Sequence, residues 1–596
     1  MPGRPRLAPS QPALMTPAAP SVTPGNGPHP DPGATSVALE ADSSGKKFRI
    51  RAKRPAPAIY QEPATKFVRS SAPHQDVVVP FASVAPDAME VNMVEVHNVC
   101  EIPAEPVKVE TADFSNEDRH ASRWKELSTL EGFDTYDITT DGEGALDCTW
   151  VEKVKNGQLD NRLTVRGFKQ VIKASDLFFA PTGAESSFRL FLLLASKFGL
   201  DIEFLDVGRA FLHAKIEEGL IIKVIPPDEW REVHGWDKFW ILKNWLYGLK
   251  GAPKGFGEWA DTALLAKEGF KPLTADPCLF FHPEKQAFCF KHMDDFAIAA
   301  KPAEINSIYE RWSAQCILKR SGTLKSGKWY EFLGILVCKT AQGFRLKNKP
   351  DMLVKIRKAL ELTGNVKIAA TPRVKLPVEA DDDVLLSPQD HSVYRTGMGL
   401  LTWFCRLRPD MLYALKCCSH FLAAPTKLAM KMLKHLSRYA IGSPDVELCI
   451  EPEPGWSWKL RTQVDSNWGN CEFTRNSTTG CLVRLFGVAL TFRCVTQAVP
   501  ASSSAEAELY GLGTGGSETL GISACLQELK EANVIEDVPV PDVESDSSAG
   551  IAAAKRQGLG GRLKHVDTRY MQIQSWIKLR RLAVTKSPET KILLTF

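Results

Sequence analysis

Two adjacent aspartates, Asp294 and Asp295, interrupt an apolar stretch that runs from Phe288 to Ala299, and no other feature constrains the fold more. The residues on either side have the composition of β-strands, so the sequence predicts a β-hairpin with the two acids at its turn. Adjacent aspartates at a turn more often cap the turn or face solvent than bind a metal, and this alternative stays open for the pair alone.

A third acid, Asp206, lies within a second strand-like apolar run, Phe204–Phe211. A charge without a partner inside such a strand is costly, which favours a ligand role for this carboxylate. Three carboxylates on two neighbouring strands can hold two divalent cations, and such a pair promotes in-line attack of a hydroxyl on a phosphate. Oxygen ligands with open water positions favour Mg²⁺, with Mn²⁺ as the alternative.

Two local patterns place further elements around these acids. Apolar residues at helical spacing predict a core helix over Ser186–Gly199, which leads into the strand that carries Asp206. Asn156-Gly157 lies between two strand-like runs and is a strong signal for a two-residue hairpin turn. The sequence therefore predicts a second hairpin upstream of the acidic strands.

The two acidic runs resemble the Asp-containing and Met-Asp-Asp motifs of reverse transcriptases. Other short runs resemble, in order and approximate spacing, the Pol polyprotein of copia-type long-terminal-repeat retrotransposons from about Trp124 to the C-terminus. These runs are Arg162-Leu163, Arg166-Gly167-Phe168, Phe179-Ala180-Pro181, Ser186-Ser187-Phe188-Arg189, Leu246-Tyr247-Gly248-Leu249-Lys250, Phe332-Leu333-Gly334-Ile335 and Arg408-Pro409-Asp410. The resemblance implies a reverse transcriptase region followed by a ribonuclease H region.

The fold implied by this resemblance is a multidomain chain of the α+β and α/β classes. Residues 115–345 would form the fingers and ferredoxin-like palm of a right-hand polymerase, and residues 346–454 a mainly helical thumb or connection. Residues 455–596 would form a C-terminally truncated ribonuclease H-like mixed sheet with helices. The Pro/Ala-rich leader, residues 1–114, is expected to be disordered because it cannot bury enough apolar surface to offset its ordering entropy.

By the same resemblance, the three acids of the two strands would hold two magnesium ions at a polymerase site. Arg162 and Arg166 would contact the incoming triphosphate, because guanidinium groups match phosphate oxygens in a fork. Phe211 would form an aromatic gate that excludes a ribose 2′-hydroxyl. The alternatives are that the arginines cover a sheet edge and that Phe211 only fills the core.

Two positions depart from the family pattern. Gly251 stands where a glutamine is usual, and His292 stands where an aromatic residue usually precedes the paired acids. Loss of an amide that hydrogen-bonds the substrate would lower activity. These departures motivate an alternative function, a decayed or repurposed retroelement copy that binds nucleic acid without catalysis.

A second set of acids follows a strand, helix, strand order: Asp465, Glu508 and Asp546. This order resembles ribonuclease H, in which such acids would hold two metal ions that cut the RNA of an RNA–DNA hybrid. Glu506 is a nearby competitor for the helical position, and any one of these acids alone could merely cap an element. The run Lys564–Tyr570 resembles a family signature that is expected to support substrate contact.

The C-terminal end lacks one expected acid. No aspartate follows Asp567, so the fourth carboxylate of the family would be missing unless Glu589 substitutes for it. Ribonuclease activity is therefore a weaker expectation than polymerase activity.

The net charge of only +4 means that any nucleic-acid surface must consist of local basic patches. Lys46–Arg54 is one, either a nuclear-import or nucleic-acid segment or simply a solvated run, and the amphipathic helix expected over Lys427–Tyr439 is another. The 14 cysteines form no CxxC pair, which indicates reduced thiols in an intracellular protein of the cytoplasm, the nucleus or both. No run is long and apolar enough to span a membrane.

The expected function is that of an RNA-directed DNA polymerase with a ribonuclease H-like domain. Its partners would be an RNA template, a DNA primer, an RNA–DNA hybrid and deoxynucleoside triphosphates, with no membrane partner. The oligomeric state is left open.

Overall fold

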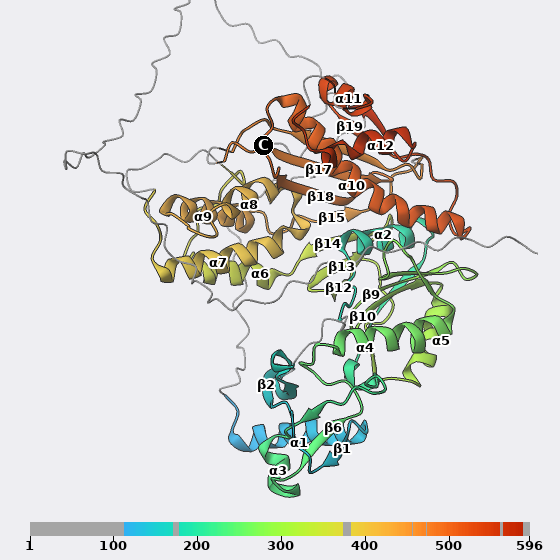
Figure 1. The fold of residues 1–596 in the computed structure, drawn as a ribbon, viewed down its shortest axis with the longest axis vertical. Helices are drawn as coiled ribbons and strands as arrows, with labels where there is room; N and C mark the ends of the chain where they lie inside the picture. Colours follow the sequence, from blue (N-terminus) through green and yellow to red (C-terminus); the bar gives the residue numbers. More distant parts are fainter. Residues whose placement is uncertain are drawn as a thin grey trace, which may run out of the picture. The chain divides into compact units, whose positions relative to one another are not determined.

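The computed structural model describes residues 113–155, 157–170, 178–373, 383–455, 457–471, 474–558, 560 and 564–587 (Figure 1). Nearly all of the predicted leader, the basic run Lys46–Arg54 and Glu589 lie outside these residues. Within the described part, no helix has both the length and the apolar character that a bilayer crossing requires.

A six-stranded antiparallel sheet contains the first three acids. In pairing order its strands are β11 (Leu318–Arg320), β4 (Asp201–Val207), β10 (Asp295–Ala300), β9 (Ala287–His292), β8 (Leu279–His282) and β7 (Lys271–Pro272). The predicted acidic hairpin is confirmed, because β9 and β10 pair directly and leave only Met293 and Asp294 at the turn. The central strands β8, β9 and β10 are mostly apolar because both faces of the sheet are covered there.

Helices cover the two faces of this sheet differently. On one face lie α4 (Ala252–Trp259), a π-helical segment (Ala260–Ala266) and α5 (Pro302–Ser313), packed on Leu205 and Phe296. On the other face lies α2 (Glu185–Lys197), which packs on Phe288 and Phe290. The predicted helix over Ser186–Gly199 is therefore confirmed.

The N-terminal described region has its own core. It comprises α1 (Asn116–Gly132), β1 (Tyr136–Thr139), β2 (Cys148–Lys155), β3 (Gln158–Val165), β5 (Lys223–Val224), α3 (Asp228–His234) and β6 (Phe239–Leu242). Strands β2 and β3 form the predicted hairpin around Gly157. Buried Trp230, Trp240 and Trp245 form the centre of this core.

A four-stranded sheet follows, in the order β12 (Trp329–Phe332), β13 (Ile335–Lys339), β14 (Phe344–Asn348) and β15 (Leu448–Ile450). Between β14 and β15 the chain forms α6 (Pro350–Ala359), α7 (Pro388–Phe404), α8 (Leu412–Ser419) and α9 (Lys427–Gly442). The predicted boundary between residues 345 and 346 lies inside β14, so the helices are an insertion between two paired strands.

The Arg408-Pro409-Asp410 run has a structural explanation in this helical insertion. Arg408 is only 1% exposed, and its guanidinium forms three hydrogen bonds with Asp410 and two with Ser443 at the end of α9. A buried charge is tolerated only when it is paired and hydrogen-bonded in this way.

The C-terminal part is a mixed five-stranded sheet with helices. Its strands, in pairing order, are β18 (Val488–Thr496), β17 (Thr478–Leu485), β16 (Arg461–Ser466), β19 (Asp542–Ser545) and β20 (Ala583–Lys586). Its helices are α10 (Ser504–Glu531), α11 (Ser548–Lys555) and α12 (Gln572–Lys578). The strand, helix, strand order expected around the second acid set is present.

Candidate functional site

The structure brings the first three acids together at one end of the six-stranded sheet. Asp206, near the end of β4, lies directly opposite Asp295, the first residue of β10. The backbone N–H of Val207 donates to the carbonyl oxygen of Asp294 at 3.0 Å, which ties the turn to β4. Met293 adopts the left-handed conformation (φ 58°) that closes this two-residue turn.

The electrostatics of this group fit a cation site. Burial, and then the neighbouring Asp294 and Asp206, raise the pKa of Asp295 to about 6. Crowding by protein atoms raises the pKa of Asp294, and Asp206 raises it further, although the side chain of Asp294 reaches the surface. Carboxylates that repel one another in this way are stabilised by a bound divalent ion.

Lys319 is a residue that the sequence interpretation missed. It lies on β11 directly opposite Asp206, and its Nζ is 2.9 Å from Oδ2 of that acid. The ammonium group of Lys319 therefore neutralises the carboxylate that a bound cation would otherwise contact. Nothing local in the sequence signals this contact, because it depends on the pairing register of two strands that are more than 100 residues apart.

We expect Lys319→Gln to lower the Mg²⁺ concentration required to half-fill this site. The ammonium and the metal compete for the same carboxylate, and exposed ion pairs of this kind contribute about 0.2–1 kcal/mol, so a shift of about 1.4- to fivefold is expected. A calorimetric Mg²⁺ titration measures it, with the exposed Lys301→Gln as the matched control. An unchanged or higher Mg²⁺ requirement would contradict the competition.

The two predicted phosphate-binding arginines lie in different surroundings. Arg162 donates a hydrogen bond to the hydroxyl of Tyr247 at 2.8 Å and lies 4.9 Å from the centre of its ring. Burial raises the pKa of Asp294, and the positive charge of Arg162 partly offsets this rise. Arg166 instead forms an exposed ion pair with Asp147 at 2.9 Å. Of the two, Arg162 has the contacts that connect it with the acidic group.

Phe211 lies in a 3-10 turn (η3, Ala210–His213) that follows Asp206. Its ring packs edge-on against Tyr247, with centroids 5.1 Å apart, and is only partly buried. Arg209, two residues before Phe211, has a positive φ of 59°. It forms an ion pair with Glu126 of α1, and Glu126 is only 1% exposed. Tyr247 belongs to a run that resembles the family, whereas Arg209 and Glu126 were not singled out from sequence. The contacts of all three could not be predicted, because each contact joins distant segments.

The departure at Gly251 is explained by its neighbour. A Cβ atom there would lie 2.2 Å from the ring of Trp245, which is 2% exposed, so no larger side chain fits unless this tryptophan moves. Glycine is thus required by the packing of this chain. His292 is paired opposite Asp295 across the hairpin. Burial raises the pKa of Asp294, and His292 offsets a small part of this rise.

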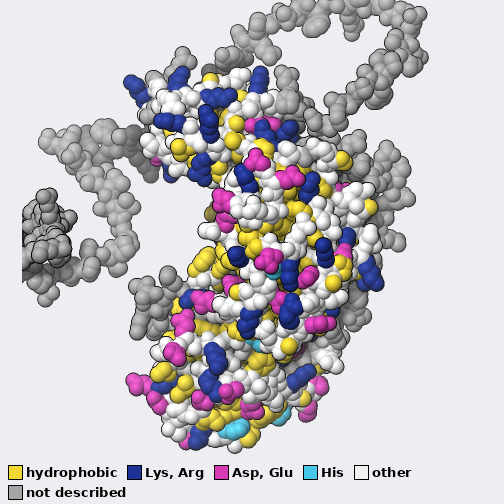
Figure 2. All heavy atoms as spheres, turned by 90° about the vertical axis from the view of Figure 1, so that its right-hand side faces the viewer, with side chains coloured by type: hydrophobic (Ala, Val, Ile, Leu, Met, Phe, Trp, Pro, Cys, Tyr) yellow, Lys and Arg dark blue, Asp and Glu magenta, His cyan; other side chains and the backbone are white. Residues whose placement is uncertain are grey.

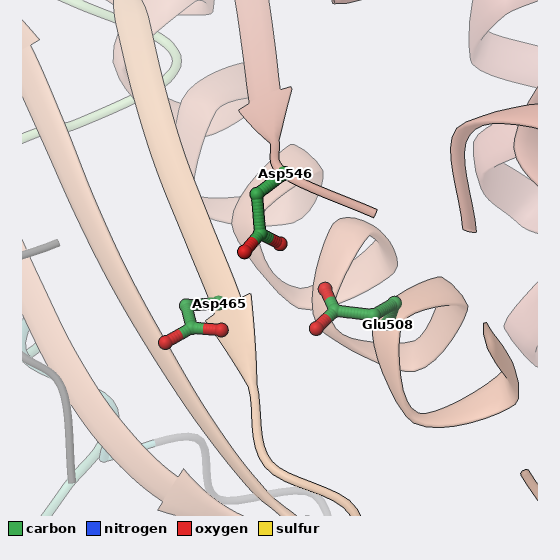
Figure 3. Close-up of side chains that lie close together, drawn as sticks. All are labelled: Asp465, Glu508 and Asp546. Carbon is green, nitrogen blue, oxygen red and sulfur yellow. The ribbon is translucent and has the colours of Figure 1, made fainter. Parts of the chain in front are cut away.

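The second acid set converges even more closely (Figure 3). One carboxylate oxygen from each of Asp465, Glu508 and Asp546 lies within 4.8 Å of the others. Asp465 comes from β16, Glu508 from α10, and Asp546 from the residue after β19, and all three point toward one another. Glu508 is buried whereas Asp546 is exposed, so the cluster is open to solvent on one side.

The hydrogen bonds around Glu508 hold its carboxylate in the cluster. It accepts from the backbone N–H of Ser466 and from the hydroxyl of Ser545, both at 3.2 Å. Burial, and then the charge of Asp465, raise the pKa of Glu508 to about 8. Burial and Asp546 also raise the pKa of Asp465. Such a set of oxygen ligands fits Mg²⁺ or Mn²⁺.

Glu506, the competitor for the helical position, lies elsewhere. Its buried carboxylate accepts from the hydroxyl of Tyr510 at 2.6 Å, lies 3.0 Å from Nε2 of His565, and also bonds to Ser502. Although burial opposes it, these hydrogen bonds lower the pKa of Glu506. This contact places His565, in the run Lys564–Tyr570, next to helix α10.

Residues that include the first acidic group are similar to a known protein family. Residues 133–375 match the family model described as reverse transcriptase (RNA-dependent DNA polymerase). This segment contains β4, β9 and β10 and therefore Asp206, Asp294 and Asp295. The residues around the first acidic group are thus similar to the reverse transcriptase family.

The curated relatives confirm the resemblance to Pol polyproteins of copia-type retrotransposons. The Pol polyprotein from transposon TNT 1-94 of Nicotiana tabacum is 28% identical over 489 residues, which are 78% of this chain and 35% of that protein. The polyprotein from transposon RE2 of Arabidopsis thaliana is 24% identical over 480 residues, 78% of this chain and 32% of that protein. The chain spans about a third of the length of these relatives.

Among the solved structures that match part of this chain are foamy viral protease-reverse transcriptases. One, in complex with double-stranded DNA, has a TM-score of 0.49 at 12% identity and covers 83% of this chain and 73% of its own. Another, in complex with an RNA/DNA hybrid, has a TM-score of 0.45 at 10% identity and covers 80% of this chain and 55% of its own.

Proposed function

We propose that this chain is an RNA-directed DNA polymerase with a ribonuclease H-like domain, and that it copies retroelement RNA into DNA. The observation that carries the proposal is the register of Asp206 opposite Asp295 inside a segment that matches the reverse transcriptase family. Its substrates would be an RNA template, a DNA primer and deoxynucleoside triphosphates. The alternative of binding without catalysis is not favoured by the relatives.

In this proposal the six-stranded sheet is the palm, the N-terminal core with the β2–β3 hairpin is the fingers, and the insertion α6–α9 is the thumb or connection. Amphipathic α9 has Lys427, Lys431, Lys434, His435 and Arg438 on surface that is at least partly exposed. Positive side chains along one helix suit the phosphates of a duplex.

Each group of the polymerase site has a defined task. Asp206, Asp294 and Asp295 would hold a pair of Mg²⁺ ions, which when bound would activate the primer 3′-hydroxyl and stabilise the transferring phosphate. Arg162, oriented by Tyr247, would bind triphosphate oxygens in a fork. Phe211, packed on the same Tyr247, would form the floor beneath the sugar.

The C-terminal acids support a nuclease site of the same general kind. Asp465, Glu508 and Asp546 would hold divalent ions against the RNA strand of an RNA–DNA hybrid. Figure 2 shows Lys and Arg side chains gathered over the end of the molecule that includes α11 and α12. Among the described residues of 555–581, the exposed Lys and Arg residues are Lys555, Arg556, Lys564, Arg569, Lys578, Arg580 and Arg581.

The direct test is extension of a DNA primer on an RNA template in the presence of Mg²⁺, run beside filter binding of the same template–primer. Binding together with Mg²⁺-dependent extension supports the proposal. Binding without incorporation, with folded protein, would overturn it in favour of a non-catalytic nucleic-acid-binding protein.

We expect Phe211→Val to admit ribonucleotides. The smaller side chain removes the ring that would collide with a 2′-hydroxyl, and steric discrimination of this size is typically worth about 10–200-fold. The ratio of kcat/KM for a ribonucleotide to that for the matching deoxynucleotide measures the effect. Phe256→Leu, a change in the same cluster behind Phe211, is the control and should leave this ratio unchanged. An unaltered ratio in Phe211→Val would mean that Phe211 is only a core residue.

A further inference from the structure

Helix α2 is buried on all sides, which is unusual for a helix that packs on one face of a sheet. Every residue from Ser187 to Ala195 is buried. A helix covered on one side only keeps a polar face toward water, so a helix that is apolar nearly all round must be covered by a second surface. Its first cover is the palm sheet, where the rings of Phe188 and Phe290 lie 5.3 Å apart.

The second cover is the ribonuclease H-like sheet. Figure 1 shows α2 between β9–β10 and the C-terminal part of the chain. Arg189 of α2, 4% exposed, donates to the carbonyl oxygen of Leu490 in β18 at 3.1 Å and lies 4.3 Å from the ring centre of Phe492. The same guanidinium donates to the carbonyl oxygen of Arg406 at 2.7 Å. One buried cation therefore joins three segments of the chain.

The apolar core is continuous across this boundary. A single cluster of buried side chains includes residues of α2, of the palm sheet, of β17–β18 and of α10, among them Leu192, Phe288, Leu490, Leu526 and Leu529. Two independent domains joined by a linker would each have a separate core and a polar contact surface. Here the two parts instead share one core.

A second polar contact joins the same two parts of the chain. The carboxylate of Glu528, in α10, accepts from the backbone N–H groups of Thr274 and Ala275 at 2.6 and 2.8 Å. The next residue in that loop, Asp276, accepts a hydrogen bond from Ser187 at the start of α2. The palm loop is thus held between α10 and α2.

Because α2 ends at Lys197 and β4 begins at Asp201, the position of α2 fixes the strand that carries Asp206. We propose that residues 457–587 have a structural function independent of RNA cleavage: they supply the second cover of α2 and so hold the polymerase strand β4 in place. The link to Asp206 rests on the proposed polymerase function, whereas the folding claim does not.

The first test cuts the connection between the two parts. A protease recognition sequence is inserted after Pro454, in the exposed stretch Glu453–Gly455, and the purified full chain is cleaved there. We expect the two pieces to co-elute at micromolar concentration in 1 M NaCl and to unfold in one calorimetric transition, as the uncleaved insertion protein does. Separation of the pieces, or two transitions, would overturn the proposal without bearing on polymerase activity.

The second test uses hydrogen exchange of full-length variants. Glu528→Ala removes two charge-assisted hydrogen bonds, and a loss of about 1.4 kcal/mol corresponds to about tenfold faster exchange in α2 and β4 if they open together with α10. Glu536→Gln, an exposed acid just beyond α10, is the matched control and should leave exchange unchanged. Faster exchange confined to α10 and the C-terminal sheet would show that the palm folds without this support.

Discussion

Asp294→Asn is expected to abolish primer extension on an RNA template while leaving the protein folded. Loss of one ligand of a divalent-ion site removes several kcal/mol of transition-state stabilisation, and each 1.36 kcal/mol is a tenfold change in rate. The expected decrease is therefore about 10³-fold. The thermal unfolding midpoint of the metal-free variant should be unchanged or higher, because Asp206 and Asp295 lose a like-charged neighbour.

Asp445→Asn provides the matched control, since Asp445 is an exposed aspartate in the loop after α9. It should retain the full extension rate. If Asp294→Asn extended primers at the rate of the unaltered protein, the assignment of the polymerase site would be wrong. A variant that lost both activity and its unfolding transition would point to a structural role instead.

Glu508→Gln is expected to abolish cleavage of the RNA strand of a hybrid and, at the same time, to stabilise the metal-free protein. The pKa of Glu508 is raised from its usual 4.5 to about 8, so the folded state binds a proton that the unfolded state has released between these values. This contribution to stability is fully present below pH 4.5 and is lost as the pH rises to about 8. A neutral amide does not incur this loss.

At pH 7.5 the free energy of unfolding of metal-free Glu508→Gln should exceed that of the unaltered protein by about 4 kcal/mol, since pH 7.5 lies three units above the usual pKa of 4.5 and each unit corresponds to about 1.4 kcal/mol. Near pH 4.5 the two should be equal in stability. Mg²⁺ should stabilise the unaltered protein, because an ion that binds only the folded state shifts unfolding by mass action. Its stabilising effect on Glu508→Gln should be smaller, because only the site formed by Asp206, Asp294 and Asp295 is left intact. Denaturant unfolding at several pH values, with and without Mg²⁺, measures both effects.

Glu506→Gln discriminates between the two helical acids. Its carboxylate bonds to Tyr510, Ser502 and His565 and is not part of the cluster, so this variant should lose stability yet keep its response to Mg²⁺. If Glu506→Gln abolished the Mg²⁺ response and Glu508→Gln preserved it, the assignment of the helical ligand would be reversed.

Much of the local structure could be predicted from the sequence because its signals are short-ranged. The hairpin with Asp294 and Asp295 at its turn, the core helix that became α2, and the strand, helix, strand order of the second acid set all follow from residue spacing. The predicted boundary at 345/346 lies inside β14, which pairs with β15 across more than 90 intervening residues, and local periodicity carries no information about such pairing.

By itself, the sequence determined which residues are acidic, which segments form strands and helices, and that residues 186–199 form a core helix. Only the tertiary structure decided that Lys319 contacts Asp206, that Glu508 rather than Glu506 joins Asp465 and Asp546, and that α2 has two covers. The physical reason is that secondary structure depends on the solvation and spacing of near neighbours. Strand register and domain contacts depend on the packing of surfaces that are hundreds of residues apart.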